Sequence, residues 1–153
     1  MSRERCRSAF TLIEVLIVVI IMAVLAATII PQFSSSTNDA KDSSLKFNLH
    51  TMRSQIEMYK VHHAGKVPVL ATFVDQMTKA TDINGNTTGT NLIYGPYFQG
   101  NLPANPFNGN DTLVAVATAG TVPTGPANAT AGWQYDVTTG GFYPNNAEYD
   151  YTK

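Results

Sequence analysis

One acidic side chain stands where a charge is costly. Glu14 lies inside a run of 21 residues, 10–30, of which 18 are hydrophobic. A carboxylate within a membrane segment costs roughly 2–3 kcal/mol or more at the centre of the helix, and less near the interface. Such a charge is tolerated when an opposite charge pairs with it, or when the side chain reaches the membrane surface. The sequence therefore predicts either a partner for Glu14 or an interfacial position.

The residues before the apolar run are basic and small. Residues 1–9 hold three arginines against one glutamate, a net charge of +2, and a basic flank of this kind keeps that end in the cytoplasm. Three interpretations follow. The run is a secretory signal peptide cut after Val24-Leu25-Ala26, or a plain membrane anchor. The third interpretation is a segment whose function depends on the position of Glu14, four residues after Phe10.

Residues 8–14, SAFTLIE, resemble the prepilin signature of the type IV pilin and type II secretion pseudopilin superfamily. The resemblance implies that a prepilin peptidase cuts between Ala9 and Phe10 and that Phe10 becomes the N-methylated first residue. It also implies that Glu14 aligns an incoming subunit with the terminus of its neighbour. The family usually has glycine where Ala9 stands. Pro31, at mature position 22, matches a proline that the family commonly carries, and we expect a helix kink there.

The first part of the chain is suited to one long helix. No glycine occurs before Gly65, and we expect a helix from about residue 10 to residue 64, roughly 80 Å long. Residues 33–38, FSSSTN, lower helix propensity and predict a flexible joint. Beyond the joint, six residues recur at helical spacing and predict one face that packs on the rest of the chain. They are Leu45, Leu49, Met52, Ile56, Tyr59 and His63.

The second part carries the turns. We expect a short helix over about 69–80, a strand over 112–118 and a hairpin in which 133–137 and 142–143 flank a Thr-Thr-Gly-Gly turn. The predicted fold class is α+β, a pilin fold in which the long helix packs on a small C-terminal antiparallel sheet. The segments YGPY and LPANPF resemble loops of the major pseudopilins of the protein G type. The expected parts are a leader (1–9), a transmembrane and assembly helix (10–30), its amphipathic continuation (31–64) and a globular head (65–153).

Other chemistry has little support in the sequence. The single cysteine, Cys6, lies in the expected leader, and the three histidines are badly spaced for a metal. Major pseudopilins often bind calcium in a C-terminal acidic loop, but this chain lacks that run of aspartates. The remaining calcium candidates are polar residues of the head: Asn108, Asn110, Asp111, Asp136, Glu148 and Asp150. We expect no other cofactor and no catalytic residue.

The expected function is that of a structural subunit of a type II secretion-like pseudopilus. Its expected partners are further copies of the chain, the prepilin peptidase/methyltransferase, an inner-membrane assembly platform, minor pseudopilins and membrane lipid. A net charge of −1 argues against nucleic acid. The expected location is the bacterial inner membrane, with the head periplasmic or, after assembly, extracellular. The alternatives are a type IV pilus subunit for adhesion, motility or DNA uptake, and a membrane-anchored periplasmic binding module or enzyme.

Overall fold

The computed structural model describes residues 10–147 and 149–151, and for residues 30–35 only the backbone. The chain divides into two compact units, residues 1–40 and residues 41–153, and the boundary falls inside a helix. The expected leader, with Cys6 and Ala9, lies outside the described residues, as does Glu148.

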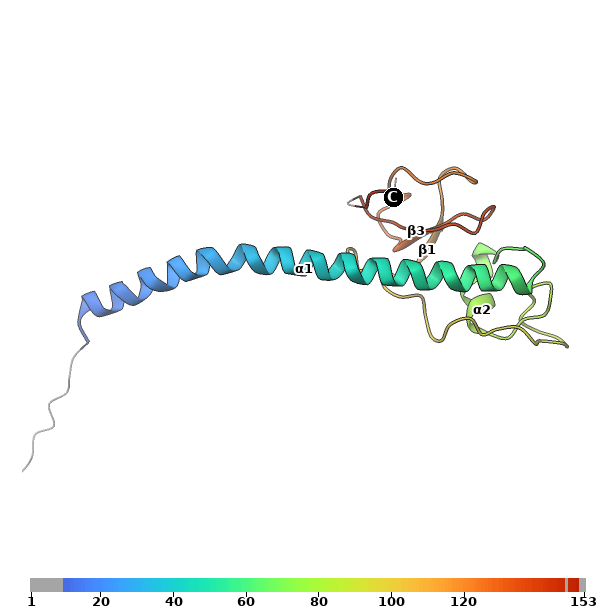
Figure 1. Cartoon of the computed structure of the whole chain (residues 1–153), viewed down its shortest axis with the longest axis horizontal. Helices are drawn as coiled ribbons and strands as arrows, with labels where there is room; N and C mark the ends of the chain where they lie inside the picture. Colours follow the sequence, from blue (N-terminus) through green and yellow to red (C-terminus); the bar gives the residue numbers. More distant parts are fainter. Residues whose placement is uncertain (1–9, 148, 152–153) are drawn as a thin grey trace, which may run out of the picture. The chain divides into compact units, whose positions relative to one another are not determined.

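The long helix is present. Helix α1 runs from Leu12 to His62, so its ends fall within two residues of the expected ones (Figure 1). The joint predicted over 33–38 is not a melted segment, because the backbone stays helical through this stretch, and its flexibility stays a prediction. Serine lowers helix propensity only modestly, and no glycine adds to its effect here. The backbone at Pro31 is helical as well, and the kink there stays a prediction.

The end of α1 is closed by a left-handed turn. Ala64 has φ 53° and Gly65 has φ 81°, and the Gly65 N–H donates to the Lys60 carbonyl at 2.8 Å. A backbone hydrogen bond that reaches five residues back, from just past the helix into its last turn, is typical of the Schellman arrangement. Gly65 therefore ends the helix as expected, but the first left-handed position falls on Ala64.

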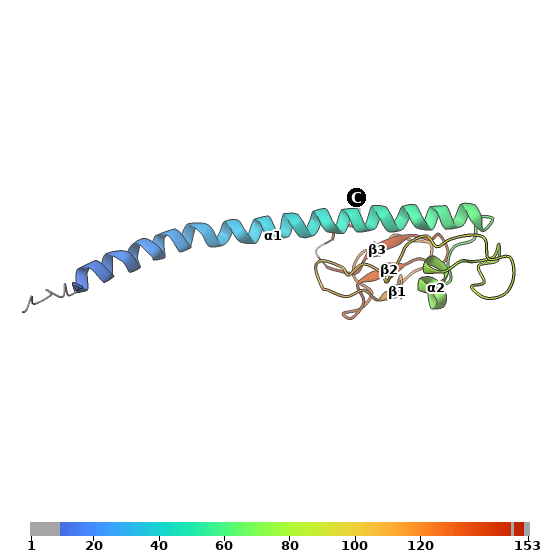
Figure 2. The same cartoon turned by 90° about the horizontal axis from the view of Figure 1, so that it is seen from below.

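Short elements follow α1. The expected second helix is a 3-10 turn, η1 (Leu70–Thr72), that leads into helix α2 (Phe73–Thr78). Three strands come after it: β1 (Leu113–Ala115), β2 (Trp133–Tyr135) and β3 (Phe142–Pro144). In Figure 2 the strands and α2 lie along one side of the C-terminal part of α1.

The sheet is mixed, where an antiparallel sheet was expected. Its order is β1-β2-β3; β2 and β3 are antiparallel, with Tyr135 opposite Phe142, as the predicted hairpin requires. Strands β1 and β2 are parallel, with Leu113 opposite Trp133. The loop between them, residues 116–132, is long enough to carry the chain back to the starting edge, so that β2 enters in the same direction as β1.

The core of the head lies between α1 and the sheet. The residues of the predicted α1 face are all buried, each at most 3% exposed. Against them pack Phe73 and Met77 of α2, together with Trp133, Tyr135 and Phe142 of the sheet. Burial of these large apolar side chains supplies the main stabilisation of the head, at roughly 1.5–3 kcal/mol for each aliphatic or phenylalanine side chain.

Candidate assembly site

A capping box encloses Glu14 at the start of α1. Its Oε2 accepts hydrogen bonds from the backbone N–H and the hydroxyl of Thr11, both at 2.8 Å. The N–H of Glu14 in turn donates to the Thr11 hydroxyl at 3.3 Å. These bonds satisfy N–H groups that the first turn of a helix leaves without partners. Glu14 therefore also organises the helix start, and Thr11 fixes its rotamer.

Thr11 is the residue of this site that the sequence argument missed. The spacing Thr-x-x-Glu before an apolar run is the signature of a capping box, so the signal was present in the sequence. The neighbouring Phe10, expected to be the first mature residue, precedes α1 and is 87% exposed.

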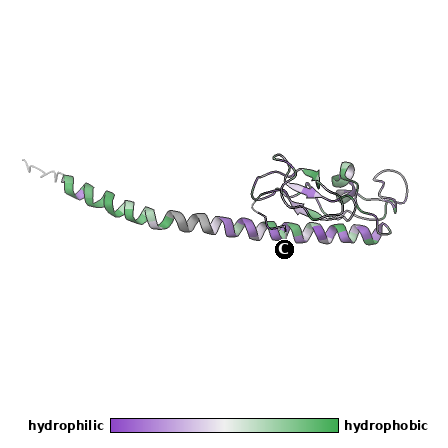
Figure 3. Ribbon diagram, turned by 90° about the horizontal axis from the view of Figure 1, so that it is seen from above, coloured by the Kyte–Doolittle hydropathy of each residue, from purple (hydrophilic) through white to green (hydrophobic). Residues whose placement is uncertain are grey.

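The segment that follows is apolar on all sides. Residues 12–29 have a mean hydropathy of 3.0, and none of them is buried in the single chain. Figure 3 shows this part of α1 almost uniformly hydrophobic, whereas the part beyond residue 40 alternates. At 1.5 Å per residue, 18 residues span roughly 27 Å, close to the thickness of a bilayer's hydrocarbon core. Exposed apolar surface of this extent requires lipid or other protein chains around it.

The calcium candidates are not gathered in one place. Asp136 holds the β2–β3 turn, because its carboxylate accepts from the N–H groups of Thr138 and Gly120, both at 2.9 Å, and from the Thr139 hydroxyl at 2.7 Å. Burial acts to raise the pKa of Asp136, but these hydrogen bonds together outweigh it and hold the pKa below its ordinary value. The carboxylate oxygens of Asp136 are therefore occupied by hydrogen bonds within the turn.

The other described candidates lie in two further loops. The Asn108 side chain donates to the carbonyls of Ala131 and Asn145 and accepts from the Asn110 N–H. Asp111 and Asp150 are exposed. Within the described part of the chain, no group of three or more His, Cys, Asp or Glu side chains is placed to hold a metal ion. The expected absence of a cofactor, with calcium as the one candidate ion, stays a prediction.

A set of buried asparagines ties the loops of the head together. Asn105, fully buried, donates to the Gly132 carbonyl at 2.8 Å and accepts from the Phe107 N–H at 3.0 Å. Asn145 donates to the Ala131 carbonyl at 2.8 Å and accepts from the Ala127 N–H at 2.7 Å. These side chains close loops that no disulfide closes among residues 10–153, where cysteine is absent. No local sequence pattern indicates the acceptors of the donated bonds, which lie 14 and 27 residues away from the asparagines.

The adjacent histidines at the end of α1 pack against tyrosines. The imidazole of His63 is fully buried and stacks on Tyr59 with 3.7 Å between ring centres. Its two nitrogens lie 2.8 Å from the Tyr59 carbonyl and 3.0 Å from the Thr81 hydroxyl. His62 bonds instead to the Tyr97 hydroxyl at 3.1 Å. The pair joins α1 to the loops after α2.

The N-terminal motif and the fold point to the same class of protein. Residues 5–30 match the prokaryotic N-terminal methylation motif, which confirms the prepilin-type signature inferred from the sequence. A long helix that starts with a single apolar span and ends against a small mixed sheet agrees with a pilin-like α+β subunit.

Within that class, the chain is similar to major pseudopilins. It is 37% identical over 59 residues to the type II secretion system core protein G of Pseudomonas aeruginosa, which is 39% of this chain and 42% of that protein. It is 30% identical over 61 residues to the core protein G of Dickeya chrysanthemi, 40% of each. The chain thus matches about two-fifths of the length of these curated relatives. No solved structure matches.

Proposed function

We propose that the chain is a structural subunit of a type II secretion-like pseudopilus. It would be inserted in the inner membrane as a prepilin, cut between Ala9 and Phe10, methylated at Phe10 and assembled into a helical filament. The observation that carries this proposal is the capped carboxylate of Glu14, four residues after the expected new terminus and at the head of an exposed apolar helix.

The chemistry of assembly follows from the two charges of that terminus. An amino group at Phe10 and the carboxylate of Glu14 are each costly within an apolar bundle or a bilayer. If the amine of one copy meets the carboxylate of its neighbour, both charges are neutralised. The match to core protein G supports this role in a secretion system. With this role we propose an inner-membrane position, a periplasmic head, and a prepilin peptidase and minor pseudopilins as partners.

The N-terminus of the mature protein tests the proposal. Intact-mass measurement and N-terminal sequencing of the protein extracted from membranes should give methylated Phe10 as the first residue. A terminus at Ala27 or Thr28 would identify a signal peptide, and an uncut Met1 would identify a plain anchor. Either result overturns the proposal in favour of a secreted or anchored binding module or enzyme.

A type IV pilus subunit would have the same mature terminus. The two roles differ in what a strain lacking the gene loses. Loss of secreted proteins from the culture medium supports the pseudopilus, and loss of adhesion, motility or DNA uptake with normal secretion supports the pilus. The identity to core protein G is the observation that favours the first.

A further inference from the structure

The part of α1 in the head has an apolar face that its own chain does not cover. Phe47, Met58 and Val61 are 71%, 49% and 76% exposed. At 100° per residue they fall on one face of the helix, roughly opposite the buried face that contains Leu49 and Ile56. We call these three residues the outer stripe. Large apolar side chains that recur at helical spacing on an uncovered face indicate a surface that another element packs on.

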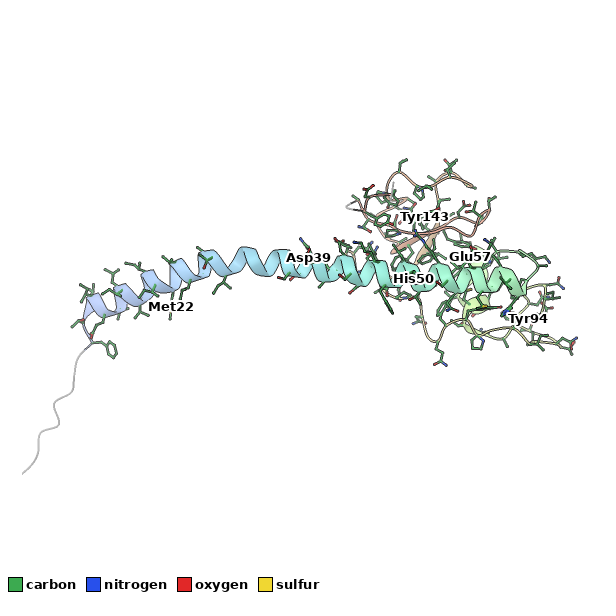
Figure 4. The ribbon with its side chains drawn as sticks, in the orientation of Figure 1. Met22, Asp39, His50, Glu57, Tyr94 and Tyr143 are labelled. Carbon is green, nitrogen blue, oxygen red and sulfur yellow. The ribbon has the colours of Figure 1, made fainter. Side chains whose placement is uncertain are left out.

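A groove lies beside the outer stripe. Its volume is about 630 Å³, and its lining includes Lys46, His50, Arg53, Met58, Val61 and Tyr149. A second hollow of about 470 Å³ continues from it toward β3 and shares Arg53, Glu57 and Tyr149 with the first. Figure 4 labels His50 and Glu57 on α1 and Tyr143 on β3.

The floor of the groove is held in place by the fold. The Arg53 Nε donates to the Phe142 carbonyl at 2.9 Å, and its guanidinium lies 5.5 Å from the centre of the Tyr143 ring. Tyr149 packs on the core cluster and stands edge-on to Tyr151, with ring centres 5.0 Å apart. A preformed groove costs less conformational entropy to fill than a mobile one.

The groove and the head loops have opposite net charge, because the groove lining holds Lys46 and Arg53 against Glu57, a net charge of +1. Residues 41–62 of α1 carry four basic and two acidic side chains, a net charge of +2. Described residues 65–151 carry two basic and five acidic side chains, a net charge of −3, and because Asp136 is buried in its turn the surface share of this charge is −2. Lys46 at the groove and Asp111 on the far loops are both exposed, and neither forms an ion pair within the described part of the chain. Two copies therefore attract when the helix face of one meets the head loops of the other.

We propose that the outer stripe and its groove are the docking surface for the acidic head loops of a second copy of this chain. This inference rests on the proposed function, since it presumes an assembly of identical subunits. A symmetric dimer through this face would bring together two surfaces of the same net positive charge, which charge repulsion disfavours. Two different surfaces in contact make a head-to-tail interface, and such an interface that does not close on itself generates a filament.

A photo-crosslinker at position 58 tests the docking surface in the full-length chain. Met58 is replaced by p-benzoylphenylalanine, a tagged second copy is co-produced, and assembled filaments are irradiated. We expect an adduct that contains both copies, with the crosslinked peptide from residues 65–151 of the neighbour. An adduct only with lipid, with an unrelated protein, with residues 12–29 of a neighbour, or within one copy would overturn the proposal.

Matched positions keep the outcome interpretable. The same probe at Val18, in the apolar stem, reports assembly itself. At exposed Thr124, in the 116–132 loop that carries no acidic side chain, it reports contacts made outside the acidic loops. If the Val18 probe crosslinks two copies and the Met58 probe does not, the docking surface is refuted and the filament stands. If no probe crosslinks and no filament forms from the unmodified chain, the proposed function itself fails. If the Met58 probe variant folds but does not assemble while the Thr124 variant does, the outer stripe is part of the interface.

A charge reversal gives an independent readout. Lys46→Glu should lower the mass of filaments recovered by shearing several-fold, and added salt should weaken the difference from the parent chain. Lys66→Glu makes the same change of charge on a lysine outside the groove and should assemble normally. Equal filament yields for the two variants would show that the groove does not recognise an acidic partner.

Discussion

Glu14 has two roles that one substitution confounds. Its carboxylate accepts two hydrogen bonds from Thr11 at the helix start and is also the proposed partner of a neighbour's amine. Alanine removes both roles. Glutamine keeps a side-chain oxygen for the capping box and removes only the charge.

We therefore expect Glu14→Gln and Glu14→Ala to abolish filaments to a similar extent. Cleavage after Ala9 should stay largely intact in both, because the peptidase site precedes α1. Filament recovery and intact mass measure the two steps separately. If the glutamine variant assembles normally while the alanine variant fails, the capping box accounts for the role of Glu14 and the charge pairing is wrong.

Asp136 gives the head an acid-sensitive turn. Its pKa lies below the ordinary value in the folded state, so the folded state binds its proton less readily than the unfolded chain does. The stabilisation is complete above about pH 4, the pKa range of an unperturbed aspartate, and is lost as the pH falls through the lowered folded pKa.

The measurement uses Trp133, the single tryptophan, which is fully buried. Its fluorescence reports the Tm of the detergent-solubilised protein. We expect this Tm to decrease once the pH is lower than about 4. Asp136→Asn should lower stability by about 1–3 kcal/mol at neutral pH, because it removes the charge that the three donors share. The Tm of the variant should also decrease less steeply with falling pH than the Tm of the parent chain. If the two decrease equally steeply, another carboxylate causes the loss of stability in acid.

Among the elements, α1 ends in a turn where Ala64 stands at a position that favours glycine. Ala64 occupies a left-handed conformation that costs a residue with a side chain about 1–2 kcal/mol. Ala64→Gly should therefore raise the free energy of unfolding by about 0.5–1 kcal/mol, the gain being reduced by the greater freedom of glycine in the unfolded chain. Gly65→Ala, at φ 81°, should lower it by a similar amount. Denaturant midpoints compare the two variants, and destabilisation by Ala64→Gly would contradict this account of the turn.

The elements also show what the sequence could predict. The buried face of α1 and the β2–β3 hairpin were predicted, because helical spacing and a Thr-Thr-Gly-Gly turn are local signals. The parallel pairing of β1 with β2 was not, because it joins residues 20 apart through a loop without regular structure. The same limit applies to the asparagines, whose function depends on distant backbone groups. At the assembly site the charge of Glu14 within an apolar run predicted its importance. The role of Thr11 was not predicted, although the Thr-x-x-Glu spacing of a capping box is present in the sequence.

The head contains no cysteine, and hydrogen bonds between its loops hold it together. The loops after α2 meet at Asn105, which bonds to Gly132, and the neighbouring Trp133 donates from its indole to the Pro103 carbonyl at 2.7 Å. These contacts join segments that are far apart in sequence, as a disulfide or a metal ion would. Because they are hydrogen bonds between neutral groups, they require no ion.

The head should therefore be insensitive to chelation and sensitive to loss of its asparagines. We expect EDTA to leave the Tm of the solubilised protein unchanged to within about 1 °C. Asn105→Ala should cost about 2–3 kcal/mol, since it removes the buried hydrogen bond to the Gly132 carbonyl and leaves the part-buried Phe107 N–H without its acceptor. Asn101→Ala, at an exposed asparagine of the same loop, should stay within about 0.5 kcal/mol of the parent. A fall in Tm on chelation that calcium reverses would show instead that an ion, bound through residues such as Asp111 or Asp150, completes the head.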